Sequence, residues 1–180
     1  MLTRNPRQSI LGQRSLETYV QSIFLIDRGS FENPQSYLDR NEYFFLTCKP
    51  AAPPATTTAV STIPEDAIQE AAAAFIANPA VKAALTFWDA NPDNSVSGLW
   101  QNLFHASQQC NDAINGICRQ RAAESATSEP VEKSREYKDW VKTMHAHLRQ
   151  KLTYGVPSPS TGLVMAVLGY EECSRRLKGP

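Results

Sequence analysis

Two histidines separated by one residue, His145 and His147, could in principle bind a metal ion. In a helix, residues two positions apart point about 200° away from each other, so the two rings cannot bind one ion there. The sequence also contains no HExxH or CxxC pattern that would complete a zinc site. We therefore predict no metal site and no cofactor.

Candidates for covalent or acid–base catalysis lack a partner group. His105 and Cys110 are five positions apart, and a Cys–His pair needs a third, orienting group that the sequence does not reveal. Glu171 and Glu172 are adjacent, so on a helix their carboxylates diverge by about 100°. The 8 glycines form no phosphate-binding GxGxxG or GxxxxGK[ST] pattern. We therefore predict no catalytic residues and a protein that is not an enzyme, with an enzyme of unrecognised type as an open alternative.

The segment 131–152 carries a charge pattern that could bind another macromolecule. On a helical wheel its apolar side chains form one band, and four cations lie along one edge of that band: Arg135, Lys138, Lys142 and Arg149. A solvated helix usually mixes charges of both signs at a spacing of four residues, whereas here the acidic side chains gather on the opposite edge. The four cations are therefore candidate contacts with a nucleic-acid backbone or an acidic partner. A solvated face without such a role is the alternative.

The rest of the sequence, which must hold this cationic edge in place, indicates an all-α fold. We predict a bundle of about five or six helices with an N-terminal helical arm. Apolar periodicity predicts helices over the following ranges: 9–26, 63–77, a short helix after Asn78, 98–122, 131–152 and 161–177. The apolar run 43–46 is either a short buried strand or the end of a second helix.

Three polar residues are predicted to cap these helices at their N-termini. Thr62 and Glu65 have the spacing of a capping box, in which each side chain accepts a free backbone N–H. Asn78 and Ser97 stand just before the short helix and the helix over 98–122.

A proline-rich stretch divides the chain. Residues 49–62 (KPAAPPATTTAVST) contain three prolines and no acidic residue, so they read as an extended, irregular connector. We accordingly predict an N-terminal helical arm or subdomain over 1–48 and a helical bundle domain over 63–180. The composition, 42% hydrophobic and 20% charged, is sufficient for a globular core.

The charges are balanced overall but unevenly distributed. The 18 basic and 18 acidic residues give no net charge, so no global field attracts nucleic acid or anionic lipid. Residues 50–130 carry 3 basic and 8 acidic groups, whereas residues 131–180 carry 9 and 5. This polarity favours an ordered assembly of copies or a partner that meets one end, although uneven scatter over a neutral surface explains it equally well.

The cysteines and tryptophans are predicted to fill the core. The 4 cysteines are widely spaced and form no CxxC pair, which is untypical of a disulfide-rich secreted scaffold.

The sequence begins without an apolar leader and contains no apolar run of membrane-spanning length, so we expect a cytoplasmic protein with no membrane partner.

Two stretches carry a family resemblance. SREYKDWVKTMHAHLRQ (134–150), followed by STGLVMAVLGY (160–170), resembles the helix pairs of small helical subunits in multisubunit CRISPR effector complexes. A helical body of this size with a Pro/Thr-rich connector also resembles, in gross design, the coat proteins of filamentous viruses. Both resemblances imply a subunit of a nucleoprotein complex that binds RNA or DNA through the phosphate backbone.

We therefore expect a non-enzymatic helical assembly or interaction subunit of a larger complex, with a protein partner or further copies of the chain. The alternative is a nucleic-acid-contacting subunit that uses the cationic edge of 131–152.

Overall fold

The structure is a computed structural model that describes residues 10–12, 14–46, 62–90, 92–125 and 130–179. Those residues contain eight α-helices and no strand, which confirms the predicted all-α bundle. The helices are α2 (Leu16–Asp27), α3 (Pro34–Arg40), α4 (Glu65–Ala77), α5 (Pro79–Leu85), α6 (Val96–Ala123), α7 (Arg135–Leu152), α8 (Thr161–Leu168) and α9 (Tyr170–Lys178). Short 3-10 turns cover Arg28–Ser30, Glu42–Phe44, Phe87–Ala90 and Val131–Lys133.

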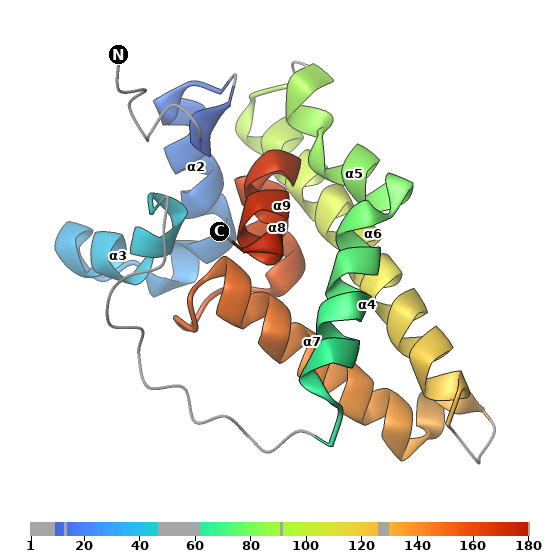
Figure 1. The fold of residues 1–180 in the computed structure, drawn as a ribbon. Helices are drawn as coiled ribbons and strands as arrows, with labels where there is room; N and C mark the ends of the chain where they lie inside the picture. Colours follow the sequence, from blue (N-terminus) through green and yellow to red (C-terminus); the bar gives the residue numbers. More distant parts are fainter. Residues whose placement is uncertain (1–9, 13, 47–61, 91, 126–129, 180) are drawn as a thin grey trace, which may run out of the picture.

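The long helix α6 and the short apolar helix α8 form the centre of the bundle (Figure 1). α6 packs most extensively against α8, α7 and α5, while α2 packs on α8. A Cβ atom at Gly162 of α8 would lie 2.5 Å from Ser107 Oγ and 2.8 Å from Ser107 O on α6. Only glycine therefore permits α8 to approach α6 this closely.

The predicted single helix over 161–177 is wrong, because the chain breaks at Gly169. Gly169 has φ 78° and ψ 170°, a conformation that is almost exclusive to glycine. Its N–H still donates to Met165 O at 2.9 Å, which closes the last turn of α8 before α9 starts in a new direction. This break, together with α3, raises the number of helices above the predicted five or six.

Two of the predicted N-terminal caps are also wrong. α4 begins at Glu65 with Pro64 at the cap position and no side-chain cap, so the Thr62–Glu65 capping box does not form. Pro64 disfavours a helical conformation at Ile63, and the helix therefore starts after the proline. α6 is capped two residues earlier than predicted, by Ser95 and not by Ser97: Ser95 Oγ accepts the N–H of residue 98 at 3.2 Å.

The other helix starts follow the expected side-chain chemistry. Asn78 caps α5 as predicted, since its Oδ1 accepts the N–H of residue 80 at 2.9 Å. Ser134 caps α7, so the predicted helix 131–152 consists of a 3-10 turn followed by the α-helix itself. α2 begins at Leu16 after a cap by Ser15, later than the predicted start at residue 9, and residues 1–9 lie outside the described residues.

Arg14 ties the N-terminal segment to the C-terminal helices. Its guanidinium donates to the carbonyls of residues 167 and 168 at the end of α8 and lies 4.7 Å from the ring centroids of both Tyr19 and Trp88. Residues of the segments 10–12 and 14–46 thus share one hydrophobic core with α8. Of the predicted connector only Thr62 is among the described residues, and the division into an arm (1–48), a connector (49–62) and a bundle (63–180) stays a prediction.

The predicted core positions are confirmed for the described cysteines but not for all three tryptophans. The cysteines at 110, 118 and 173 are buried as predicted, and Cys48 lies outside the described residues. Trp88 and Trp140 are buried, but Trp100 is 39% exposed, so the prediction of three core tryptophans is wrong at that position.

The run 43–46 is neither a strand nor an α-helix, because a buried 3-10 turn contains its first two residues. Within the described segments, no helix is both long and apolar enough to cross a bilayer.

Candidate interaction surfaces

The four cations predicted on the 131–152 segment lie together on the exposed edge of α7. The apolar band beside these cations is buried, which fixes the direction of the cationic edge: its buried residues are Trp140, Met144, Leu148 and Leu152. All four cations are exposed. Arg135 Nε lies 3.7 Å from Asp139 Oδ2, a weak pair on the surface. Among the described residues, no carboxylate lies within salt-bridge distance of Lys138, Lys142 or Arg149. The edge therefore presents at least three cations that an external anion can reach.

His145 and His147 lie on different flanks of α7, as their spacing predicts. His145 Nδ1 is 3.4 Å from Thr161 Oγ1 at the start of α8, whereas His147 faces α4 and α9. Burial lowers the pKa of both rings, helped by Arg149 at His145 and by Lys151 at His147, although Glu65 opposes the shift at His147. No group of three or more potential metal ligands gathers anywhere in the described residues.

The other catalytic candidates do not form reactive pairs either. His105 is exposed and its Nε2 lies 2.8 Å from Gln109 Nε2, while Cys110 is fully buried. Burial raises the pKa of the Cys110 thiol to about 12, so this thiol is protonated and unreactive at neutral pH. Glu171 is exposed, whereas Glu172 is buried in an ion pair on α9.

That ion pair belongs to a buried polar cluster that sequence reasoning missed. Arg176 Nε lies 2.6 Å from Glu172 Oε1, and the two side chains are only 1% and 5% exposed. The remaining guanidinium nitrogens of Arg176 donate to Leu152 O at the end of α7 and to Tyr43 O and Leu46 O of the N-terminal segment. Every contact of this arginine is thus with the protein itself, so the cluster is an internal support and not an open site.

A face of α6 carries large apolar side chains that are exposed. Val96, Trp100 and Phe104 follow one another at four-residue spacing, and each is exposed; we call these three residues the α6 face. The rings of Trp100 and Phe104 stack with centroids 6.0 Å apart. From residue 94 to residue 111 the sequence contains no Asp, Glu, Lys or Arg. This absence of charge was the available sequence signal that distinguishes the face from an ordinary solvated helix surface.

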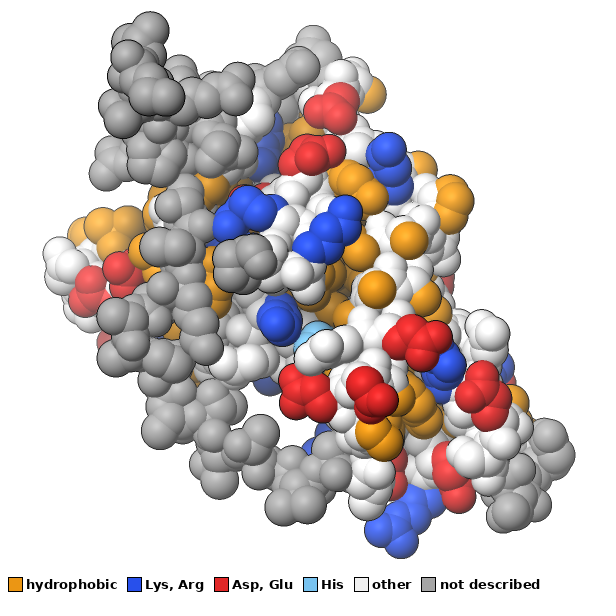
Figure 2. All heavy atoms as spheres, viewed as in Figure 1, with side chains coloured by type: hydrophobic (Ala, Val, Ile, Leu, Met, Phe, Trp, Pro, Cys, Tyr) orange, Lys and Arg blue, Asp and Glu red, His pale blue; other side chains and the backbone are white. Residues whose placement is uncertain are grey.

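A second exposed apolar surface runs over α2 and α3. Leu16, Val20 and Phe24 of α2 also repeat at four-residue spacing, and all three are exposed. Phe24 and Phe31 both contact the ring of Tyr37, with centroids 6.0 Å and 5.5 Å away. Hydrophobic side chains are visible at the edge formed by α3, beside acidic ones (Figure 2).

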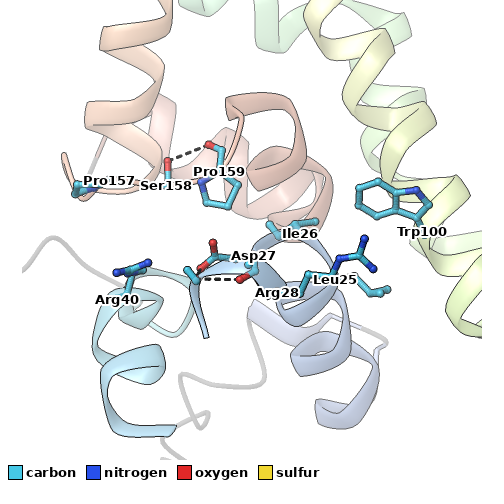
Figure 3. Close-up of a pocket in the computed structure, with 11 residues that line it drawn as sticks. Leu25, Ile26, Asp27, Arg28, Arg40, Trp100, Pro157, Ser158 and Pro159 are labelled. Carbon is cyan, nitrogen blue, oxygen red and sulfur yellow. Dashed lines mark hydrogen bonds between the residues drawn. The ribbon is translucent and has the colours of Figure 1, made fainter. Parts of the chain in front are cut away.

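A groove of about 750 Å³ lies between the end of α2, the end of α3, α6 and the loop that precedes α8 (Figure 3). Leu25, Ile26 and the loop residues 157–159 form much of its wall, and Trp100 closes one end. Arg28 and Arg40 also line it. Sequence reasoning missed this groove, because its residues come from four separate segments.

Comparison of the chain with models of protein families, with curated proteins and with solved structures gives no match.

Proposed function

We propose that this protein is a non-enzymatic assembly subunit whose copies associate through the α6 face. The observation that carries the proposal is the combination of exposed aromatic side chains with a long uncharged stretch of sequence. Monomeric proteins rarely expose contiguous apolar surface that is free of charge, and such surface typically marks an interaction site. Cores of protein–protein interfaces are enriched in Trp and Phe and depleted of charged residues, as this face is.

The absence of charge favours a second copy of the chain as the partner. A face without charge offers nothing that selects an oppositely charged protein, whereas interfaces between identical chains are the more apolar class. Two α6 helices that pack antiparallel about Trp100 place Val96 opposite Phe104 of the second copy. The two α6 helices bring no like charges of their own together over residues 94–111, because this stretch is uncharged in both copies. The interface is then self-complementary, as a twofold contact requires.

Sedimentation equilibrium of the full chain over a wide concentration range tests the proposal. We expect reversible self-association that Phe104→Ser weakens by about 2 kcal/mol, or about 30-fold, because a stacked aromatic at the centre of an interface is a typical hot spot. Phe31→Ser is the matched control, since Phe31 and Phe104 are each 47% exposed but lie on different surfaces. A strict monomer at all concentrations, or equal weakening by the two variants, contradicts the proposal.

A second candidate function is contact with a nucleic-acid backbone through the edge of α7. It is supported by the three exposed cations, Lys138, Lys142 and Arg149, that have no carboxylate partner among the described residues. Such binding is independent of base sequence and weakens steeply with salt.

Fluorescence anisotropy with single-stranded and duplex oligonucleotides at several salt concentrations tests this candidate. Lys138→Gln/Lys142→Gln should weaken binding and lower the slope of log affinity against log salt by about 2, one for each lost phosphate contact. Lys82→Gln/Lys178→Gln removes the same charge from exposed positions away from α7 and should leave the slope nearly unchanged. Equal slopes for both double variants, or no binding at low salt, exclude the candidate.

A further inference from the structure

The exposed apolar side chains of α2 form a continuous ridge. Leu16, Val20 and Phe24 are four residues apart, so they lie one above the other along about 12 Å of the helix. The ring of Phe31 meets that of Phe24 edge-on, with centroids 6.0 Å apart, and so extends the ridge beyond the end of α2. We call these four residues the α2 ridge. Each of them is between 44% and 54% exposed.

Acidic side chains flank the α2 ridge. Glu17 is three residues before Val20, which makes the two side chains neighbours on the helix surface, and Glu32 directly follows Phe31. Acidic side chains also lie beside hydrophobic ones at the edge formed by α3 (Figure 2). Four exposed carboxylates of the segment 15–46 have no cation of the described residues within salt-bridge distance: those of Glu17, Glu32, Asp39 and Glu42. These carboxylates are therefore available to an external cation.

The two cations of the same segment belong to the neighbouring groove and not to the α2 ridge. Arg28 and Arg40 line that groove together with Leu25 and Ile26 (Figure 3). On the helix, Leu25 and Ile26 point about 140° and about 120° away from Val20, so the groove and the ridge occupy different sides of α2. The surroundings of the ridge are consequently negative.

An apolar ridge with a negative rim matches a helix whose apolar stripe is flanked by Lys or Arg. Side chains spaced four residues apart form the kind of ridge that packs into the groove of a second helix. Opposite charges around such a contact attract the partner and determine its orientation.

A second copy of the chain is a poor match for this surface. Two α2 ridges placed together bring their acidic rims together, and like charges oppose that contact. The cationic edge of α7 does not match either, because none of the described residues of α7 is a large apolar side chain that is exposed. The complementary helix therefore belongs to a different protein.

We propose that the α2 ridge binds a basic amphipathic helix of another protein. The apolar stripe of the partner packs on Val20 and Phe24, and its Lys or Arg side chains lie beside Glu17 and Glu32. This site shares no residue with the α6 face and does not rest on the proposed self-association. An assembly through the α6 face leaves the α2 ridge available to this partner.

Fluorescence anisotropy of the full chain with two labelled synthetic peptides tests the proposal. Both peptides are about 18 residues long, enough to form a helix in water, and repeat Leu at the spacing of one helix face. The remaining positions are Lys and Ala in the first peptide and Glu and Ala in the second. The Lys peptide should bind about 10-fold or more tightly than the Glu peptide, because only its charges are opposite to those of the rim.

Variants of the ridge and of its rim should change this binding in different ways. Phe24→Ser should weaken binding of the Lys peptide about 10-fold, because it removes an aromatic contact at the centre of the surface. Val20→Ser should also weaken it and leaves the ring contacts of Phe24 in place. Glu17→Gln/Glu32→Gln should reduce the preference for the Lys peptide over the Glu peptide.

Matched controls come from other helices. Phe104→Ser removes a ring that is 47% exposed, close to the 44% of Phe24, and should leave peptide binding unchanged. Asp112→Asn/Glu171→Gln removes two exposed carboxylates of α6 and α9 and should leave the preference unchanged. Circular dichroism establishes that each variant is folded.

Four outcomes overturn the proposal. They are no binding of the Lys peptide, equal binding of the two peptides, equal weakening by Phe24→Ser and Phe104→Ser, and equal effects of the rim and control charge variants. Phosphatidylcholine vesicles test the other kind of apolar surface. Vesicle binding that Phe24→Ser abolishes, without binding of the Lys peptide, identifies a lipid surface as the partner and also overturns the proposal.

Discussion

Replacing Arg176 with methionine tests how the N-terminal segment is held in the bundle. The methionine keeps much of the aliphatic packing but removes every hydrogen bond of the guanidinium. Those bonds reach Glu172 on α9, Leu152 O at the end of α7, and Tyr43 O and Leu46 O in the N-terminal segment. A single side chain thus connects three parts of the fold that are distant in the sequence.

The cost follows from what the substitution leaves behind. Removing one partner of a buried ion pair typically costs about 3–5 kcal/mol, because the other charge stays buried. Here Glu172 keeps Arg175, whose Nη2 lies 2.6 Å from Oε1 and whose Nε lies 2.9 Å from Oε2. Because Glu172 keeps this partner, the loss of stability is smaller than for an unpaired buried charge. The three backbone carbonyls also lose their donor, and each one that water cannot reach adds about 1 kcal/mol or more to the loss. We expect a loss of about 4 kcal/mol, or about 10 °C in the melting temperature of a chain of this size.

Urea denaturation measures the free energy of unfolding, and Arg175→Met is the matched control. Arg175 binds the same carboxylate, but its side chain is 47% exposed, so its loss should cost about 1 kcal/mol or less. Hydrogen exchange adds a local readout, since the amides of 42–46 should exchange faster in Arg176→Met but not in Arg175→Met. Equal destabilisation by the two variants would refute the claim that Arg176 connects these segments.

Three further predictions concern other particular positions. Gly169→Ala should lower the free energy of unfolding by about 1–3 kcal/mol in urea denaturation, because φ 78° with ψ 170° strains any residue that has a Cβ atom. The strain is in the backbone, since the atoms nearest to the added Cβ are 3.7 Å away. An unchanged free energy of unfolding would contradict this prediction. Burial lowers the pKa of His145 and His147, so the unfolded chain binds protons first as the pH falls below the ordinary value of 6.5. The free energy of unfolding should therefore decrease progressively as the pH falls below 6.5. His145→Asn/His147→Asn should make the free energy of unfolding less dependent on pH in this range. The three buried thiols, whose pKa values are raised by burial, should react with iodoacetamide far more slowly in the native than in the urea-unfolded chain, as measured by mass spectrometry at each cysteine.

Local periodicity and cap chemistry predicted the helical class and most helix positions, because those signals depend on neighbouring residues. The break at Gly169 was missed because α8 is apolar on all sides, so its pattern continues without a change of face. The Thr62–Glu65 capping box was wrong because Pro64 between them restricts the backbone of the preceding residue and so excludes the cap by Thr62. These errors concern backbone geometry and not residue type.

The functional surfaces were harder to predict because they depend on distant neighbours. In α6, Leu99 and Leu103 are buried while the adjacent Trp100 and Phe104 are exposed, and apolar spacing alone does not determine which flank meets another helix. The buried position of Arg176 has no local sequence signal, because its carbonyl partners in the N-terminal segment are 130 or more positions away. The cationic edge of α7 was predictable, since one helix contains all of it.

A photo-crosslinking measurement tests the central claim most directly: a benzophenone side chain at position 104 of the full chain, with the products mapped by mass spectrometry. The proposed assembly predicts intermolecular crosslinks from position 104 to the α6 helix of a second copy, and much weaker intermolecular crosslinking from a benzophenone at position 31. Crosslinks from position 104 that stay within one copy, or that reach other copies no more often than those from position 31, would contradict it.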